Sequence, residues 1–146
     1  MGSNEYLFEK IFFKKKVIEN NNFLTKVCAL LIHAAKIDEN YTDKEEEIIK
    51  KTLNELGVED QNISKTIKEA KIIEESSNQI LDFTREVKGL PEKSKIKIVE
   101  ALWSIIYSDK DADIYETNLM RRLAGLLYID NKTMGDIKEK IKQNSK

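Results

Sequence analysis

Residues that break helices or crosslink a fold are scarce in this sequence. Its 146 residues include one cysteine, one proline and five glycines. The single cysteine, Cys28, excludes an internal disulfide, which favours a reducing compartment, and we expect the protein to be cytoplasmic. No segment alternates apolar and polar residues for long enough to predict a strand. The composition therefore favours helices and excludes a disulfide-rich secreted domain.

Two further absences narrow the class of partner. No uninterrupted apolar run approaches the roughly 18 residues that a membrane-spanning helix needs. The formal net charge is -1, so no global positive field attracts DNA or RNA, and we expect no nucleic-acid partner. With 40% hydrophobic and 35% charged residues, the chain has the balance of helices that bury one stripe and solvate the remainder.

Apolar positions that recur every three or four residues predict an all-α fold, a single bundle of about seven to eight helices. The sixth helix, opened by Pro91, is apolar on most sides and is expected to be the central, most buried one. The second has a narrower stripe, formed by Leu24, Val27, Cys28, Leu31 and Ala35. The approximate bounds are Glu5–Glu19, Phe23 onward, Asp43–Leu56, Asp60–Glu75, Asn78–Lys88, Pro91 onward, Ile114–Leu127 and Asp130 onward.

Two helix-loop-helix stretches match without gaps when 71 is added to each residue number. Asp38 falls on Asp109, and Glu45 falls on Glu116. Apolar matches continue along the following helix, namely Ile48 with Leu119, Ile49 with Met120, Leu56 with Leu127 and Val58 with Ile129. We interpret these matches as an internal duplication, which predicts that the two loops lie at related positions on one bundle.

Both repeated loops carry oxygen-bearing side chains at alternate positions, and both follow the pattern Asp, x, Asp/Asn, x, Asp/Thr, x, x, Glu. Such side chains can converge on a hard divalent cation, Ca²⁺ or Mg²⁺. The second loop is not an EF-hand, because Ile114 stands where glycine is needed and Met120 where glutamate is needed. The candidate metal ligands are Asp109, Asp111, Asp113, Glu116, Asp38 and Glu45.

Helix capping explains some of these residues without a metal. Thr42-x-x-Glu45 and Asp113-x-x-Glu116 have the spacing of capping boxes, in which the Glu reaches back to the N–H of the capping residue. Capping does not account for Asp109 and Asp111, so the second loop is the better candidate for a cation site. Solvated caps and a cation site both remain open at this point.

The two loops also carry a resemblance to a known family. The stretches Ile37-Asp38-Glu39-Asn40-Tyr41-Thr42-Asp43-Lys44-Glu45 and Ser108-Asp109-Lys110-Asp111-Ala112-Asp113-Ile114-Tyr115-Glu116 resemble the twice-occurring A-D-G-x-x-D-x-x-E loop of TerB-like proteins. Residues 99–103 and 121–124 resemble the C-terminal half of that family, which includes tellurite-resistance protein B and the N-terminal domain of the co-chaperone DjlA. The chain is similar to its short stand-alone bacterial members. The resemblance implies an all-helical fold, an acidic metal site and an association with stress or envelope functions.

The first 20 residues are predicted to form a separate amphipathic helix in front of a TerB-like domain over residues 21–146. Phe8, Ile11 and Phe12 form its apolar side, and Lys14 to Lys16 follow. Such a helix packs on the bundle, docks a protein partner or lies on an anionic membrane surface. Peripheral membrane contact and an unidentified protein partner are therefore both open.

No catalytic constellation can be assembled from the sequence. Cys28 and His33 are five residues apart on one helix and point to different faces. Trp103 and Tyr107 are expected to pack in the core. We therefore predict a non-catalytic module with a divalent-cation site in its acidic loops. The alternative is a metal-free adaptor that docks a protein or membrane surface through its N-terminal helix.

Overall fold

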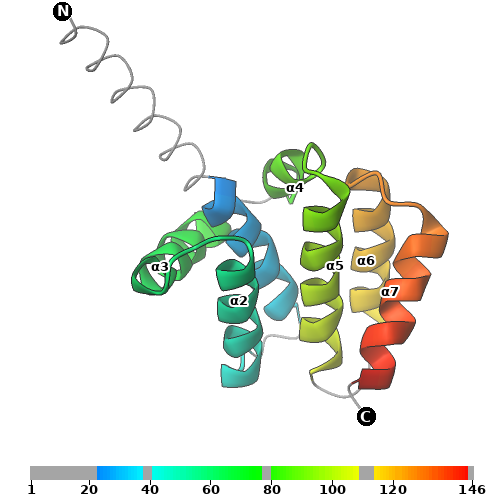
Figure 1. Ribbon diagram of the computed structural model, residues 1–146, viewed down its shortest axis with the longest axis horizontal. Coiled ribbons are helices and arrows are strands. Elements are labelled where there is room, and N and C mark those ends of the chain that lie inside the picture. Colours follow the sequence, from blue (N-terminus) through cyan, green and yellow to red (C-terminus); the bar gives the residue numbers. More distant parts are fainter. Residues whose placement is uncertain (1–22, 38–40, 77–79, 109–113, 145–146) are drawn as a thin grey trace, which may run out of the picture.

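The computed structural model describes residues 23–37, 41–76, 80–108 and 114–144, and this part of the chain consists of helices joined by short turns and loops. This part contains seven helices and no strand, so the predicted all-α class is confirmed (Figure 1). The first helix spans residues 23–35. It is followed by α2 (Asp43–Glu55), α3 (Asp60–Ser76), α4 (Leu81–Val87), α5 (Glu92–Tyr107), α6 (Ile114–Leu126) and α7 (Asn131–Asn144).

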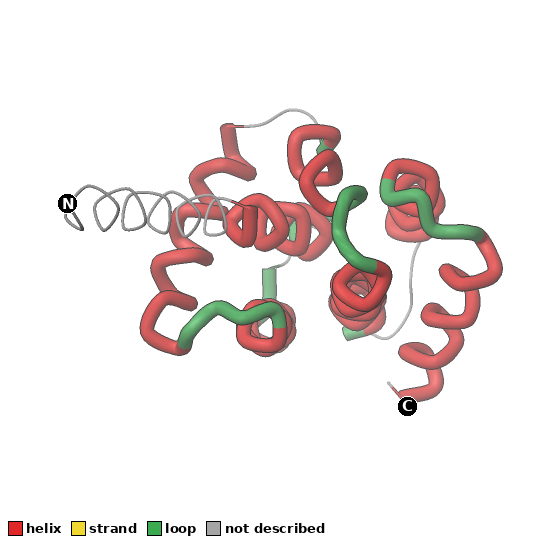
Figure 2. The backbone as a smooth tube through the Cα atoms, turned by 45° about the horizontal axis from the view of Figure 1, so that its top comes forward, coloured by secondary structure: helices red, strands yellow, loops and turns green. Residues whose placement is uncertain are grey.

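Two helices form the centre of the bundle, the 23–35 helix and α5. In Figures 1 and 2, α2 and α3 lie on one side of this central pair, and α6 and α7 lie on the other. Helix α5 packs against α7 and α2, while α4 packs against α6. The sequence correctly predicted that the helix after Pro91 is central, since its residues Ile98, Val99 and Leu102 are fully buried.

The apolar stripe predicted for the 23–35 helix includes too few of the residues that the helix buries. Besides Val27 and Cys28, the helix buries Ala29, Leu30 and Ile32, which lie outside that stripe. Helices cover it on several sides, so nearly its whole circumference is apolar. The core therefore rests on two buried helices rather than one.

Local caps begin or end three of the helices. Gly57 ends α2 with a positive φ of 105°, and the Val58 amide donates to the Leu53 carbonyl at 2.9 Å. This is the hydrogen-bond pattern of a Schellman cap. Asp130 caps α7, since its Oδ1 accepts from the Thr133 amide at 2.6 Å. Pro91 precedes the first residue of α5.

Helices α2 and α6 correspond closely. Their first residues, 43 and 114, and their last residues, 55 and 126, are 71 positions apart. The Ile129 amide donates to the Ala124 carbonyl at 2.9 Å, in the place of the Val58–Leu53 bond. The duplication itself stays a prediction, but the two helices share bounds and the same kind of C-terminal cap.

No described helix is both long enough and apolar enough to cross a membrane. The predicted N-terminal helix, Glu5–Glu19, lies outside the described residues, as do the first two residues predicted for the helix Asn78–Lys88. The latter begins at Leu81 in the structure.

Candidate functional site

The first acidic loop ends in a capping box. The Thr42 hydroxyl accepts from the Glu45 amide at 3.1 Å, and Glu45 Oε1 accepts from the Thr42 amide at 2.8 Å and from the Thr42 hydroxyl at 2.9 Å. The Glu45 side chain lies against the protein, since the residue is only 2% exposed. The carboxylate that was predicted as a metal ligand is therefore engaged in stabilising the start of α2.

The other predicted ligands are not placed in detail. Asp38, Asp109, Asp111 and Asp113 lie outside the described residues. Glu116 lies in the first turn of α6, where only the backbone is described. Over residues 23–37, 41–76, 80–108 and 114–144, no three His, Cys, Asp or Glu side chains gather in a way that could hold a metal ion. The cation site thus stays a prediction about residues 109–116.

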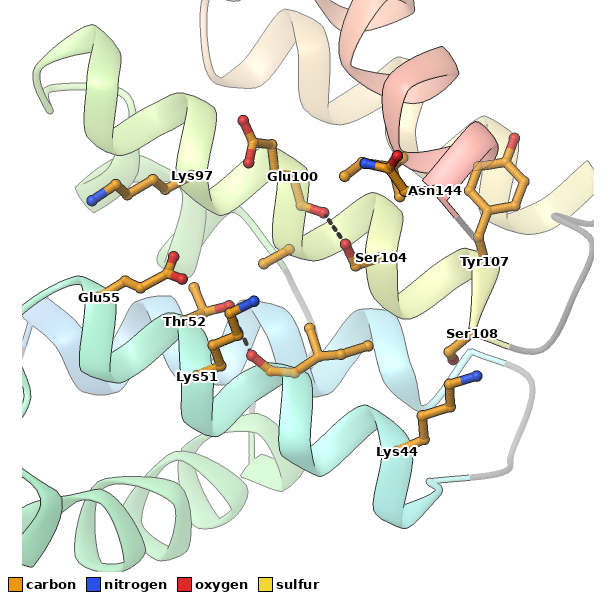
Figure 3. A pocket seen from close by; sticks show the side chains of 13 residues that line it. Lys44, Lys51, Thr52, Glu55, Lys97, Glu100, Ser104, Tyr107, Ser108 and Asn144 are labelled. Atoms are coloured by element: carbon orange, nitrogen blue, oxygen red, sulfur yellow. Dashed lines mark hydrogen bonds between the residues drawn. The ribbon is translucent and has the colours of Figure 1, made fainter. Parts of the chain in front are cut away.

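A cleft of about 640 Å³ opens between α2, α5 and α7 (Figure 3). Its floor is one stripe of α5 that includes Lys97, Ala101 and Ser104. Ile48 of α2 and Ile141 of α7 add apolar surface at its sides. The volume lies within the range of ordinary ligand pockets, but the cleft is open along its length and has the form of a groove.

The charges around this cleft are unequal. Lys44, Lys51 and Lys97 line it, and none of them forms an ion pair in the described part of the chain. Of the two lining carboxylates, Glu100 pairs with Lys140 of α7 at 3.5 Å. Glu55 is the other. The cleft therefore combines the apolar side chains of Ile48, Ala101 and Ile141 with three ammonium groups that form no ion pair in the described chain, which suits an occupant with acidic side chains.

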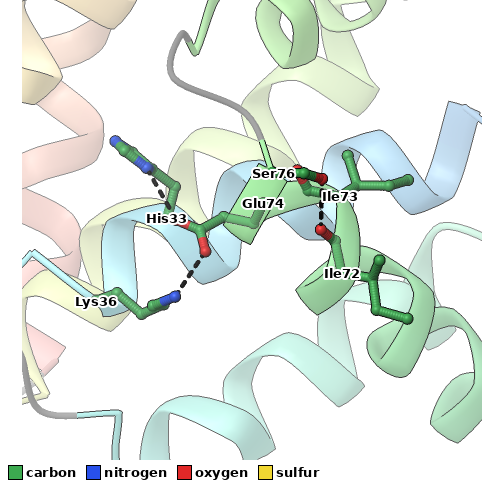
Figure 4. A network of polar contacts seen from close by, with 6 residues as sticks. All are labelled: His33, Lys36, Ile72, Ile73, Glu74 and Ser76. Carbon is green, nitrogen blue, oxygen red and sulfur yellow. Dashed lines mark hydrogen bonds and ion pairs between the residues drawn. The ribbon is translucent and has the colours of Figure 1, made fainter.

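A polar cluster joins the 23–35 helix to α3 (Figure 4). Glu74 accepts from Lys36 at 2.7 Å and lies 3.3 Å from His33 Nδ1. The hydrogen bond that Lys36 donates to Glu74 raises the pKa of the Lys36 ammonium group. His33 is the only histidine, and its contact with Glu74 links the 23–35 helix to α3.

Cys28 lies in an apolar setting that does not suit a nucleophile. It is fully buried, and burial raises the pKa of its thiol to about 12. Burial likewise raises the pKa of the Tyr41 phenol, with a further contribution from the nearby Glu46 carboxylate. A thiol that stays protonated at neutral pH reacts slowly. The full burial of Cys28 confirms that it is a core residue.

Trp103 and Tyr107 pack in the core, as predicted. Their rings stack at 5.8 Å between centroids, and the Trp103 indole N–H donates to the sulfur of Met134 at 3.3 Å. Trp103 is 2% exposed. Tyr107 is 6% exposed and also lines the cleft.

Sequence reasoning missed the cleft because its residues come from three helices that are distant in the sequence. One signal was present in α5, where Lys97, Ser104 and Ser108 follow one another at helical spacing along an otherwise apolar segment. A polar stripe on an otherwise buried helix indicates a face that is open to solvent.

The pattern of the family described as "Tellurite resistance protein TerB" matches residues 24–139 of this sequence. No curated protein and no solved structure matches the chain. The family match runs from the 23–35 helix into α7 and thus includes both acidic loops and the two buried helices. It also includes the residues of α2 and α5 that line the cleft, but it ends before Ile141 and Asn144 of α7. Since this span is most of the sequence, the chain belongs to the TerB family.

Proposed function

We propose that this TerB-family chain is a non-catalytic binding module that holds a divalent cation, Ca²⁺ or Mg²⁺, in its second acidic loop. The ligands would be Asp109, Asp111, Asp113 and Glu116. Side-chain oxygens at alternate positions of a short loop are the donors that such cations prefer. The family match supports the proposal, because it includes this loop.

The observation that carries the proposal is the difference between the two loops. In the first, the bonds between Thr42 and Glu45 use the carboxylate in a helix cap. A matching cap in the second loop would use Asp113 and Glu116, and it would not account for Asp109 and Asp111. Two carboxylates so close together repel one another unless a cation or solvent neutralises them. Asp38 and Glu45 as additional ligands remain predictions from the sequence.

Calorimetric titration with Ca²⁺ and Mg²⁺ tests this site. We expect binding heat with the wild type and none with Asp109→Asn/Asp111→Asn. The matched control is Asp82→Asn/Asp136→Asn, which removes the same two charges from exposed positions of α4 and α7 and should bind as the wild type does. If the wild type gives no binding heat with either cation, the proposal is wrong and a metal-free adaptor is favoured.

Contact with a membrane surface through residues 1–20 is the second proposal, and it rests on the basic segment Lys14 to Lys16 beside Phe8, Ile11 and Phe12. Three lysines at roughly 1 kcal/mol each give weak, salt-sensitive attraction to anionic lipid. Flotation with vesicles that contain phosphatidylserine should recover the full chain at low salt but not at high salt. Recovery of a chain without residues 1–20 to the same extent would refute this role. A part in stress or envelope functions rests on family membership alone.

A further inference from the structure

Helix α4 covers one face of the central 23–35 helix. Its Glu86 pairs with Lys26 of that helix at 3.1 Å, and its Phe83 and Val87 are buried in the core. Helix α4 also packs against α6, and its Phe83 lines a small hollow together with Ile73 of α3. The 23–35 helix, α6 and α3 therefore form the surface on which α4 packs, and we call this surface the seat of α4.

The cleft is the counterpart of this seat. Adding 71 to the residue numbers carries the 23–35 helix onto α5 and α3 onto α7, while subtracting 71 carries α6 onto α2. These three helices, α5, α7 and α2, are the ones that bound the cleft. Figure 2 shows the same relation in space, with α4 beside the central pair on one side and α2 and α7 flanking α5 on the other.

The correspondence extends to single side chains. Lys26, which holds α4 through Glu86, corresponds to Lys97, which lines the cleft without an ion pair in the described chain. Ile73, which lies beside α4, corresponds to Asn144, which lines the cleft. The same lysine thus stands in both places, but within the described residues Lys26 forms an ion pair and Lys97 forms none.

The cleft has less apolar surface than the seat of α4. Ala101 stands in the place of the fully buried Leu30, and Asn144 stands in the place of Ile73. Less apolar area on the floor means that less free energy is lost when the groove faces water. These replacements suit an occupant that binds and leaves, whereas α4 is a permanent cover.

We propose that the cleft between α2, α5 and α7 binds a short, acidic, amphipathic helix of a partner protein. We infer that the occupant is a helix because α4, a helix of seven residues, fills the corresponding seat. The cleft runs along α5 from Lys97 to Ser108, a length of about 16 Å, which accommodates three turns of helix. The acidic character follows from Lys44, Lys51 and Lys97, which have no carboxylate partner in the described chain. Apolar side chains of the partner would lie over Ile48, Ala101 and Ile141.

The N-terminal segment of this chain is a poorer occupant. Residues 1–20 contain Lys10 and Lys14 to Lys16 against three glutamates, so the segment has a small positive charge. Charge complementarity therefore favours a partner that is more acidic than this segment.

Peptide display tests the proposal even though the partner is unidentified. Peptides that bind the full chain are selected from a random library of roughly 16-residue peptides, which are long enough for a helix that fills the groove. We expect enrichment of peptides that place apolar residues at i, i+3, i+4 and i+7 and acids beside them. Fluorescence anisotropy then measures how the enriched peptides bind Lys51→Glu/Lys97→Glu, where affinity should fall at least about tenfold.

Three controls complete the experiment. Lys65→Glu/Lys68→Glu reverses two exposed charges on α3, outside the cleft, and should change affinity less than about twofold. Ser104→Trp fills the floor without changing charge and should abolish binding. It also decides the matter if the double charge reversal unfolds the chain. A synthetic peptide of residues 1–22 should not bind the cleft.

The contrary results are distinct. The proposal is wrong if no peptide is enriched, or if the enriched peptides bind the Lys51→Glu/Lys97→Glu and Ser104→Trp chains as tightly as the wild type. It is also wrong if the peptide of residues 1–22 binds the wild type and loses affinity in these variants, since the cleft would then receive a segment of its own chain. Full displacement of the peptides by millimolar inorganic phosphate would identify a small-anion site instead. None of these results depends on a cation in the second loop.

Discussion

Tyr128 ends α6 in the same left-handed backbone conformation with which Gly57 ends α2. The φ angles are 57° and 105°, and the two residues are 71 positions apart. The Gly57 amide donates to the Asn54 carbonyl at 3.1 Å, and the Tyr128 amide donates to the Gly125 carbonyl at 3.4 Å. Glycine adopts this conformation freely, whereas a residue with a side chain loses about 1–2 kcal/mol there. The second cap therefore carries backbone strain that the first avoids.

Substitution of Gly57 should reveal this difference. A Cβ atom added at Gly57 meets no atom within 4 Å, so any cost of Gly57→Ala comes from the backbone and not from a clash. We expect the free energy of unfolding to fall by about 1 kcal/mol, since the strain exceeds the gain from a stiffer unfolded chain. Chemical denaturation followed by circular dichroism measures this change.

Gly125→Ala is the matched control for Gly57→Ala. It lies in α6, where a Cβ atom also meets open space, and its φ is not positive. Alanine should stabilise this helix by roughly 0.5 kcal/mol. If both alanines change stability in the same direction, the left-handed conformation is not the cause.

Local patterns predicted much of this fold from the sequence. Residues such as Gly57, Pro91 and Asp130 act on their own helix ends, and their effects do not depend on distant parts of the chain. The capping box at Thr42 and Glu45 is equally local. These features explain why α2, α5 and α7 begin or end close to their predicted bounds.

Features that depend on packing between distant helices were not predicted. The cleft needs α2, α5 and α7 together, and no local pattern specifies their arrangement. Lys95 is another case, because a lysine in a sequence is expected to be exposed. The structure buries it to 7% exposure, and its Nζ donates to the Leu127 carbonyl at 3.0 Å. The acceptor is 32 residues away, at the end of another helix.

Lys95 should therefore stabilise the end of α6. Lys95→Met keeps the apolar stem but leaves the Leu127 carbonyl without this donor, and we expect a loss of about 1–2 kcal/mol in the free energy of unfolding. Lys93→Met, at an exposed position two residues earlier, should change stability by less than about 0.5 kcal/mol. An increase in stability for Lys95→Met would mean that desolvation of the ammonium group outweighs its hydrogen bond.

The role of Glu45 can be separated from metal binding by comparing two substitutions. Glu45→Gln keeps an oxygen that can accept from the Thr42 amide, whereas Glu45→Ala removes it. We expect Glu45→Ala to cost about 1 kcal/mol and Glu45→Gln less than half of that. Thermal unfolding with and without Ca²⁺ gives both values. If Glu45→Gln loses a stabilisation by Ca²⁺ that the wild type has, the first loop also holds a cation.

Cys28 should make the protein less stable in alkali. The unfolded chain releases the thiol proton near pH 8.5, whereas the pKa of the buried thiol is about 12. Between these values the unfolded state binds fewer protons than the folded state, so stability falls as the pH rises. The contribution is absent below the unfolded pKa and grows to about 2 kcal/mol of destabilisation at pH 10.

Urea denaturation at pH 8 and pH 10 should show this loss in the wild type but not in Cys28→Ala. The raised pKa of Tyr41 acts in the same direction at higher pH, but it is present in both proteins and largely cancels in their difference. Parallel pH profiles for the two proteins would contradict the raised pKa of the buried thiol.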